Sequence, residues 1–308
     1  MKRFLLFLLT FAMVLLSFTA CSNNFSDTDS VTDDELQNLK DQFEKEEKAP
    51  IEILVLGDST AQNYFPADKE IPQYIRNLNI AGWSTYFSDY FDKAVTINKL
   101  ASSGTSSLSF TKDPKYQRFL DAVSEGDYVL IQFAHNDQKK SDLDRYTDPS
   151  IPLEDADMDC KGEDGTYSYQ ACLYRYYIEV ALMKGAHPIL LCPISRRDST
   201  TGQTINEGHR EYVQAIKDLA TDLQIPCLDM TSVTEEFYNT LFREGGAKAT
   251  GKLHAYASEE RTSLDTSHLS PLGAYQIAAL TADELKKEVP ALKEYFLETP
   301  KEFKDPLA

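Results

Sequence analysis

The sequence predicts an α/β fold, a three-layer αβα sandwich built around a five-stranded parallel sheet. Apolar runs of strand length alternate with segments of helical periodicity along most of the chain. The first run, residues 51–56, is almost entirely aliphatic, as expected of a central strand covered on both faces. Small or polar residues follow several of these runs, at the sheet edge where open α/β proteins keep their ligands.

The other elements are assigned in chain order from the same patterns. Further strands are expected at residues 95–100, 128–133, 188–192 and 226–228. Helices are expected at residues 114–124, 169–184, 207–223, 231–243, 274–287 and 290–297. Gly185 is expected to end the second helix. Ser270 and Pro271 have the residue types of an N-cap and a first helical position.

The N-terminal segment has the pattern of a secretory signal. Lys2 and Arg3 precede an apolar run that ends in small residues before Cys21. The segment Phe18-Thr19-Ala20-Cys21 resembles a bacterial lipobox, which implies cleavage before Cys21 and lipidation of its thiol. We therefore expect a lipoprotein signal peptide over 1–20, an acidic tether over 21–50 and a single domain over 51–308. The domain would lie outside the cytoplasm, anchored at the bacterial cell surface or periplasmic face; an uncleaved signal anchor is the alternative.

The charge and the cysteines limit the function classes. A net charge of −18 argues against nucleic acid or an anionic membrane surface as the main partner, so only the lipid would contact a membrane. Cys160 and Cys172 lie in one polar insertion and could close a loop in an oxidising compartment. Cys192 and Cys227 are expected to be buried thiols. No cysteine and histidine spacing indicates a zinc site, and no metal or cofactor is expected.

Three predicted strands end in residues suited to an active site. The turn that contains Ser59 follows the first strand, Gly104 follows the second, and Asn136 follows the third. Because parallel strands share one direction, these residues are expected at one edge of the sheet. The alternative for Ser59 is a cap on the next helix.

Asp265 and His268 supply what a nucleophilic serine requires. A serine hydroxyl reacts once an imidazole accepts its proton, and a carboxylate orients that imidazole. The imidazole suits this task because its unperturbed pKa is about 6.5. The backbone N–H groups of Ser59 and Gly104, with the Asn136 amide, could hold the oxyanion that develops. The pattern predicts acyl transfer to water through an acyl-Ser59 intermediate.

These motifs resemble the four sequence blocks of the SGNH (GDSL-type) hydrolases, and most of all the bacterial rhamnogalacturonan acetylesterases. The resemblance implies a flavodoxin-like sheet and a metal-independent esterase that acts on acetyl groups of pectic sugars. By matching motif, Ser59 would be the nucleophile, Asp265 and His268 would complete the triad, and Ser59, Gly104 and Asn136 would form the oxyanion hole. The blocks are Gly57-Asp58-Ser59, Gly104, Ala134-His135-Asn136-Asp137 and Asp265-Thr266-Ser267-His268.

The chain departs from the family pattern in two places. Ala134 stands where the third block usually has glycine, and its methyl group is expected to be tolerated. The second block often reads Gly-Gly-Arg-Ser, whereas this chain has Ser103-Gly104-Thr105-Ser106. The missing arginine weakens the case for a substrate that carries a uronic acid. Asp137 is expected to cap its own turn.

Several charged residues near the predicted site have two interpretations each. Arg196 and Arg197 follow the fourth strand and either bind a substrate carboxylate or form a solvated or salt-bridged pair. His135 either lines the site or is a satisfied loop histidine. Lys139 and Lys140 are expected to be solvated surface residues.

The leading functional hypothesis is a surface-tethered carbohydrate O-acetylesterase acting on rhamnogalacturonan or pectin. Its alternatives among enzymes are an esterase for acetylated xylan or mannan, or for a lysophospholipid or thioester. The loops after the first three strands are small and polar, which favours acetyl over a long acyl chain. A surface glycan-binding protein without activity is the alternative from a different class. Retention of every triad residue argues against it.

Overall fold

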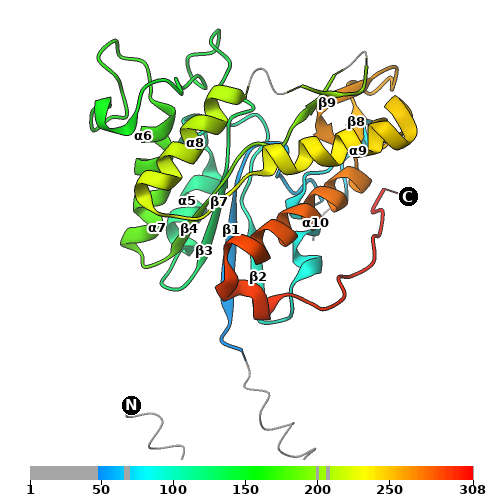
Figure 1. The fold of residues 1–308 in the computed structure, drawn as a ribbon, viewed down its shortest axis with the longest axis horizontal. Helices are drawn as coiled ribbons and strands as arrows, with labels where there is room; N and C mark the ends of the chain where they lie inside the picture. The colour runs from blue at the N-terminus through cyan, green and yellow to red at the C-terminus, as the bar shows by residue number, and fades with distance from the viewer. Residues whose placement is uncertain (1–47, 66–69, 199–200, 206–208, 308) are drawn as a thin grey trace, which may run out of the picture. The chain divides into compact units, whose positions relative to one another are not determined.

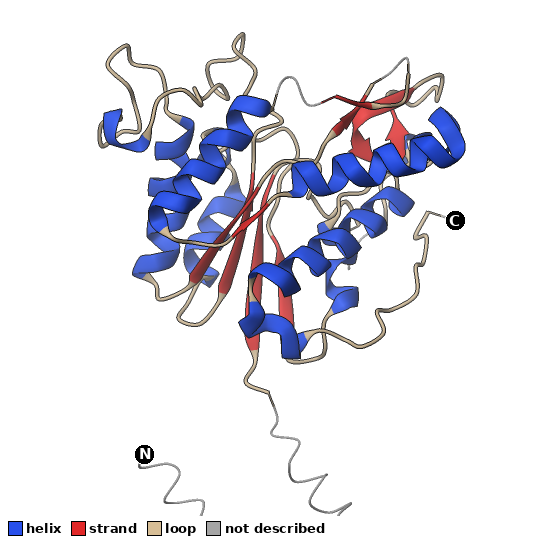
Figure 2. Ribbon diagram, in the orientation of Figure 1, coloured by secondary structure: helices blue, strands red, loops and turns tan. Residues whose placement is uncertain are grey.

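The computed structural model describes residues 48–65, 70–198, 201–205 and 209–307. At its centre is a sheet of five parallel strands in the order β2-β1-β3-β4-β7 (Figures 1 and 2). This is the flavodoxin-like order, and it confirms the predicted fold class. The predicted strand ends differ from the observed ones by at most one residue. The strands are β1 (Ile51–Gly57), β2 (Val95–Lys99), β3 (Tyr128–Gln132), β4 (His187–Leu191) and β7 (Cys227–Leu228).

Helices cover both faces of the sheet (Figure 1). One face carries α5 (Pro114–Ala122), α6 (Tyr169–Leu173), α7 (Glu179–Met183) and α8 (Arg210–Leu223). The other carries α4 (Ser84–Phe87), α9 (Met230–Gly251) and α10 (Pro271–Glu288). A short helix, α3 (Gln73–Leu78), lies outside these layers and contacts β8, and a 3₁₀ helix over Pro290–Tyr295 follows α10.

The aliphatic composition of β1 follows from its central position. Successive side chains of a strand point to opposite faces of the sheet. Ile53 and Val55 pack in the core under α4 and α10, whereas Leu54 and Leu56 pack in the core under α5 and α8. All four side chains are fully buried, so a polar residue at any of them would lose its hydration.

Two predicted helices differ from the observed ones. The helix expected over 169–184 contains a π-helical segment, Tyr174–Ile178, between α6 and α7. Within it, the buried Tyr177 hydroxyl donates a hydrogen bond to the Ser107 carbonyl, so this segment supports the loop after β2. Helix α9 continues to Gly251, beyond the predicted end at residue 243, with a break at Gly246 where φ is 61°. The predicted start of α10 is confirmed, since Ser270 Oγ accepts a hydrogen bond from the Gly273 N–H.

Two strand pairs were not predicted. β5 (Arg196–Arg197) pairs with β6 (Thr204–Ile205), and β8 (His254–Tyr256) pairs with β9 (Leu264–Leu269). The segment that contains Asp265 and His268 was expected to follow a loop, and the structure places it inside β9. Most side chains of β9 are only half-buried and polar, so the strand has no apolar alternation for a sequence pattern to detect. Its conformation depends on pairing with β8 and with Ala81.

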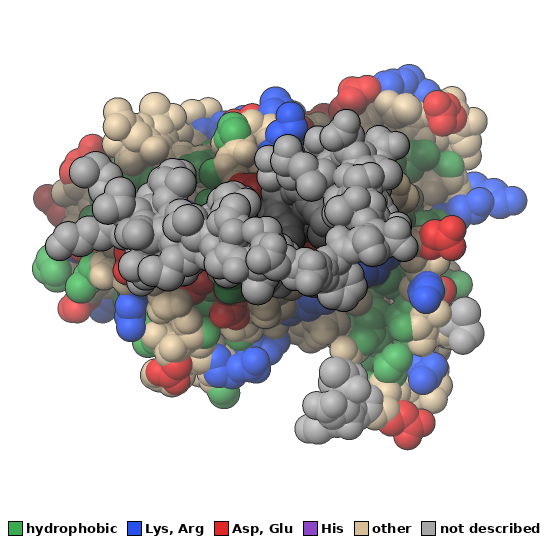
Figure 3. Space-filling view, turned by 90° about the horizontal axis from the view of Figure 1, so that it is seen from below, with side chains coloured by type: hydrophobic (Ala, Val, Ile, Leu, Met, Phe, Trp, Pro, Cys, Tyr) green, Lys and Arg blue, Asp and Glu red, His purple; other side chains and the backbone are tan. Residues whose placement is uncertain are grey.

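The expected signal peptide, the expected lipidation site Cys21 and most of the expected tether lie outside the described residues. Within those residues, no helix is long and apolar enough to cross a membrane. On the face shown in Figure 3, acidic and basic side chains are interspersed where described atoms are visible.

Candidate active site

The turn after β1 places Ser59 at the carboxyl edge of the sheet. Gly57 is required at the start of this turn, because a Cβ there would lie 2.6 Å from the Gln132 carbonyl oxygen. Asp58 Oδ1 accepts hydrogen bonds from the Thr60 N–H at 2.9 Å and the Thr60 hydroxyl at 2.8 Å. These bonds close the turn, with the Ser59 side chain nearly buried at its apex.

Ser59, His268 and Asp265 are hydrogen-bonded in series although Ser59 and His268 are 209 positions apart. His268 Nε2 lies 2.9 Å from Ser59 Oγ, and His268 Nδ1 lies 3.0 Å from Asp265 Oδ2. The second oxygen, Asp265 Oδ1, accepts from the backbone N–H groups of Ser267 at 2.6 Å and His268 at 2.7 Å. Both carboxylate oxygens are therefore engaged, and the imidazole lies between the carboxylate and the hydroxyl.

The Asp265 carboxylate is stabilised in its ionised form. Burial alone would raise its pKa, but the hydrogen bond and charge of His268 and the two backbone N–H groups lower the pKa to about 2. An ionised carboxylate at Nδ1 keeps the proton on that nitrogen and leaves Nε2 as the acceptor. The arrangement therefore suits removal of a proton from Ser59.

Three N–H donors lie on the loops beside Ser59. Gly104 has a φ of 77°, a conformation that glycine adopts without strain. Within the described residues, the backbone N–H groups of Ser59 and Gly104 donate no hydrogen bond. Asn136 Nδ2 donates to the Thr105 carbonyl at 2.9 Å and retains a second hydrogen, since a carboxamide nitrogen carries two. The three groups are available to an oxyanion.

Lys139 is exposed, as the sequence indicated, but its side chain also contacts the turn that carries Asn136. Its Nζ donates a hydrogen bond to Asn136 Oδ1 at 2.7 Å. Lys140 is likewise exposed, with its Nζ 5.9 Å from the centre of the Tyr146 ring.

Asp137 joins two loops instead of capping its own turn. Its Oδ1 accepts hydrogen bonds from the N–H and hydroxyl of Ser107 and from the Thr147 hydroxyl. Burial raises the pKa of this carboxyl to about 6, although the bonds from Ser107 and Thr147 act in the opposite direction. Asp137 thereby fixes the turn that carries Asn136 against the loop that carries Gly104.

His135 and the two arginines are closer to the interior than the sequence suggested. The buried His135 ring lies 4.4 Å from the His209 ring. Burial, and then the neighbouring His209 and Arg196, lower the pKa of His135 well below its usual value, so the ring is neutral. Arg196 Nη2 donates to the His135 carbonyl at 3.2 Å. Arg197 is 7% exposed, so the solvated interpretation is wrong for it.

Sequence reasoning missed Arg145. Its Nη2 lies 4.0 Å from the position that a Cβ on Gly104 would occupy. The residue belongs to the polar insertion after β3, where no motif or periodicity distinguishes one arginine from another. Only the fold of that insertion brings it to the loop after β2.

No candidate metal site was found among the residues that the structure describes, since no three of their His, Cys, Asp and Glu side chains are grouped to hold an ion. The four cysteines in this part of the chain, Cys160, Cys172, Cys192 and Cys227, are free thiols.

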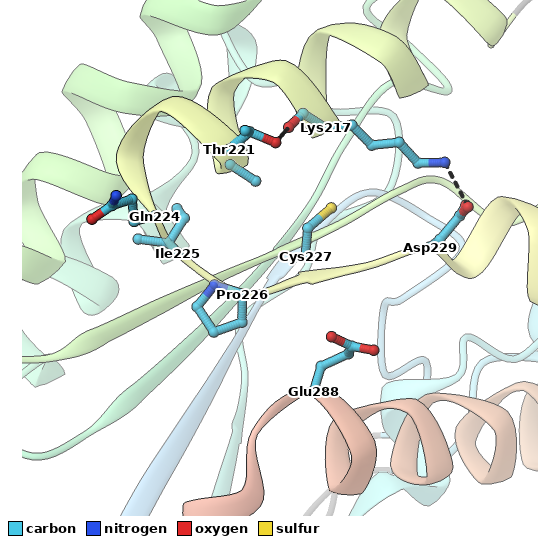
Figure 4. Close-up of a pocket in the computed structure, with 9 residues that line it drawn as sticks. Lys217, Thr221, Gln224, Ile225, Pro226, Cys227, Asp229 and Glu288 are labelled. Atoms are coloured by element: carbon cyan, nitrogen blue, oxygen red, sulfur yellow. Dashed lines mark hydrogen bonds and ion pairs between the residues drawn. The ribbon is translucent and has the colours of Figure 1, made fainter.

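A surface pocket of about 500 Å³ lies away from these residues, at the sheet edge formed by β7 (Figure 4). Lys217 and Asp229 form an ion pair of 2.6 Å at its wall, and Cys227 and Glu288 also line it. It contains no histidine and no serine, so it offers no partner for a hydrolytic reaction at Cys227.

Comparisons with known proteins identify the family and agree with this fold. Residues 55–274 match the model of the GDSL-like lipase/acylhydrolase family. The chain is 28% identical to rhamnogalacturonan acetylesterase RhgT of Bacillus subtilis, over 81% of this chain and 96% of the relative. It is 26% identical to the probable rhamnogalacturonan acetylesterase YesY of the same organism, over 76% of this chain and 92% of that relative. The crystal structure of protein YxiM from Bacillus subtilis has the same fold, with a TM-score of 0.56 and 23% identity over 78% of this chain and 57% of that one.

Proposed function

Since the chain belongs to the GDSL-like lipase/acylhydrolase family and is a serine ester hydrolase, we propose that it removes acetyl groups from plant cell-wall polysaccharide, with acetylated rhamnogalacturonan as the substrate. One observation carries the catalytic part of this proposal, namely the 2.9 Å contact between His268 Nε2 and Ser59 Oγ. A hydroxyl in contact with an oriented imidazole is the arrangement that acyl transfer requires.

The first half of the reaction forms an acetyl-enzyme. Ser59 Oγ attacks the carbonyl carbon of the acetyl ester while His268 Nε2 takes the hydroxyl proton. The carbonyl oxygen becomes an oxyanion, which accepts hydrogen bonds from the Ser59 and Gly104 N–H groups and from Asn136 Nδ2. The tetrahedral intermediate then expels the sugar oxygen, which receives the proton from His268. The products are the free sugar hydroxyl and acetyl-Ser59.

The second half regenerates the serine. A water molecule gives a proton to His268 Nε2 and attacks the acetyl carbon, and the same donors hold the second oxyanion. Collapse of this intermediate expels Ser59 Oγ, which regains its proton from His268, and releases acetate. Asp265 stays ionised throughout and stabilises the imidazolium.

The substrate assignment draws support from the relatives and from the size of the loops. Two curated relatives named as rhamnogalacturonan acetylesterases align along most of this chain. The residues around Ser59, Gly104 and Asn136 are small and polar, and Asn136 and Thr105 are buried beside one another. Such loops suit a two-carbon acyl group better than a long chain.

Acetate release from a substrate panel tests the proposal. The panel contains acetylated rhamnogalacturonan, homogalacturonan, xylan and mannan, with para-nitrophenyl acetate and longer para-nitrophenyl esters for the chemistry alone. We expect the highest kcat/KM on acetylated rhamnogalacturonan and little turnover of long esters. Ser59→Ala should abolish every activity, while Ser232→Ala, at the start of α9, should change none. Turnover that survives in Ser59→Ala would remove Ser59 from the mechanism, and a preference for xylan or mannan would correct the substrate.

We also propose that the enzyme is held at the bacterial surface by lipid on Cys21. The proposal rests on the lipobox-like segment Phe18-Thr19-Ala20-Cys21. Expression with labelled palmitate should give a labelled protein in the membrane fraction. Cys21→Ser should lose both the label and the membrane association, and an unlabelled wild-type protein would contradict the proposal.

A further inference from the structure

Arg145 is placed beside the proposed oxyanion hole by an ordered loop. The loop begins at Asp137 and returns to it, since the Thr147 N–H donates to the Asp137 carbonyl at 3.1 Å. Within the loop, the N–H groups of Arg145 and Tyr146 donate to the Asp142 carbonyl at 2.9 and 2.8 Å. Asp137 also holds the loop after β2, so the same carboxyl determines where Gly104 and Arg145 lie relative to each other.

The Arg145 guanidinium is oriented but not saturated. Asp142 Oδ2 lies 3.4 Å from Arg145 Nε, so this ion pair uses Nε and does not involve the two terminal nitrogens. Among the described residues, no hydrogen bond engages Nη1 or Nη2, and the side chain is 38% exposed. A planar guanidinium with two free N–H groups matches the two oxygens of a carboxylate.

Two cations of this loop, Arg145 and Lys139, lie beside the proposed oxyanion donors. Lys139 donates its hydrogen bond to the Asn136 amide, which is neutral. Asp144 pairs with Lys112 at 3.0 Å, across the loop. Asp142 is the acidic group paired with Arg145 itself. In a protein with a net charge of −18, two cations beside the oxyanion donors are a local exception.

We propose that Arg145 binds the carboxylate of an acidic sugar that neighbours the acetylated one, and thereby selects substrates with uronic acid next to the ester. The proposal deepens the proposed function and rests on it for the identity of the ester. Its geometric basis is the 4.0 Å between Arg145 Nη2 and the Cβ position of Gly104, whose N–H would hold the acetyl oxygen. A carboxylate on the same or the adjoining sugar would then reach the guanidinium. The arginine that the second sequence block lacks is in this way supplied by the insertion after β3.

The test compares two forms of one substrate, an acetylated galacturonate-containing oligosaccharide and its methyl ester. Acetate release gives kcat and KM for wild-type enzyme, Arg145→Gln, Arg145→Lys and the control Lys140→Gln. We expect the wild type to prefer the free acid, and the preference to shrink at high salt because exposed charges are screened. Arg145→Gln should raise KM on the acid about ten-fold, the size of one charged hydrogen-bonded contact, while its effect on the methyl ester stays small. Arg145→Lys should keep part of the preference, and Lys140→Gln all of it.

Equal kcat/KM of the wild type on acid and methyl ester would overturn the proposal, as would an equal loss on both in Arg145→Gln. The proposed function fails in a different way, by absence of acetate release from every acetylated carbohydrate. In that case, inhibition of para-nitrophenyl acetate hydrolysis by a galacturonate trisaccharide tests whether Arg145 binds a carboxylate. Inhibition that Arg145→Gln relieves supports the carboxylate site, and absence of inhibition rejects it.

Discussion

Lys139 Nζ donates a hydrogen bond to Asn136 Oδ1 at 2.7 Å, while Asn136 Nδ2 donates to the Thr105 carbonyl. A charged donor on the carbonyl oxygen draws electron density from the amide and makes its N–H groups stronger donors. The cation also places positive charge near the developing oxyanion in a partly buried environment, where it acts more strongly than in water. Lys139 is therefore a positioning residue for Asn136.

Lys139→Met should lower kcat about ten-fold, a fraction of the loss that follows removal of a whole oxyanion donor, with little change in KM. Steady-state kinetics on para-nitrophenyl acetate measure the split between kcat and KM. Lys139→Arg should restore much of the rate because it keeps the charge. Lys140→Met, one residue further and exposed, is the matched control and should behave as the wild type. An effect confined to KM would contradict this role.

Asp265→Asn should lower kcat by about ten thousand-fold, as loss of the orienting carboxylate does in the Ser-His-Asp triad of serine proteases. An asparagine could donate its N–H to His268 Nδ1. The imidazole would then carry its proton on Nε2, and no acceptor would remain for the Ser59 hydroxyl. Burst kinetics with para-nitrophenyl acetate would show slow acylation. A rate within ten-fold of the wild type would show that the carboxylate does not orient His268.

Ala134→Gly should stabilise the protein by about 1 kcal/mol. Ala134 has a φ of 131°, which L-residues rarely adopt and which costs them about 1–3 kcal/mol. Glycine removes that strain and forfeits one buried methyl group, worth about 0.8 kcal/mol. Denaturant unfolding measures the difference. Ala101→Gly, also fully buried but without a positive φ, is the control and should destabilise. A loss of stability in Ala134→Gly would show that packing of the methyl group outweighs the strain.

Stability should fall as the pH drops from about 6.5 to about 4, in part because of His254. Burial lowers the pKa of this histidine from 6.5 to about 4 in the folded protein. In that window the unfolded chain binds the proton and the folded chain does not, so lowering the pH favours unfolding. The difference of pKa corresponds to about 3 kcal/mol between pH 7 and pH 4.

In His254→Gln that part of the pH dependence should disappear, because glutamine does not titrate and its amide can still donate to the Thr250 carbonyl, as Nδ1 does at 3.1 Å. The free energy of unfolding at pH 7 and pH 4 measures the effect. If variant and wild type lose the same stability between pH 7 and pH 4, another group is responsible for the pH dependence. His209 is an example, since burial lowers its pKa to about 3.

The sequence by itself determined the parallel sheet and the residues at its carboxyl edge. A short, almost continuous aliphatic run that ends in a glycine turn favours a central strand covered on both faces, and the residue after such a strand lies at the sheet edge. Ser59, Gly104 and Asn136 could be placed in this way. Asp265 and His268 were identified by motif, although the strand that holds them was not.

Only the tertiary structure decided how the polar insertion contributes to the site. Lys139, Asp137 and Arg145 lie in a segment without hydrophobic periodicity. Ser107 and Gly104, the neighbours of Asp137 and Arg145, belong to the loop after β2, whereas Lys139 bonds to Asn136 within its own turn. The contacts of Asp137 with Ser107 and of Arg145 with Gly104 join groups distant in sequence, and they depend on where the sheet directs each loop. Periodicity reports which side chains leave water, whereas the partner that a buried or half-buried polar group finds is fixed by the folded arrangement.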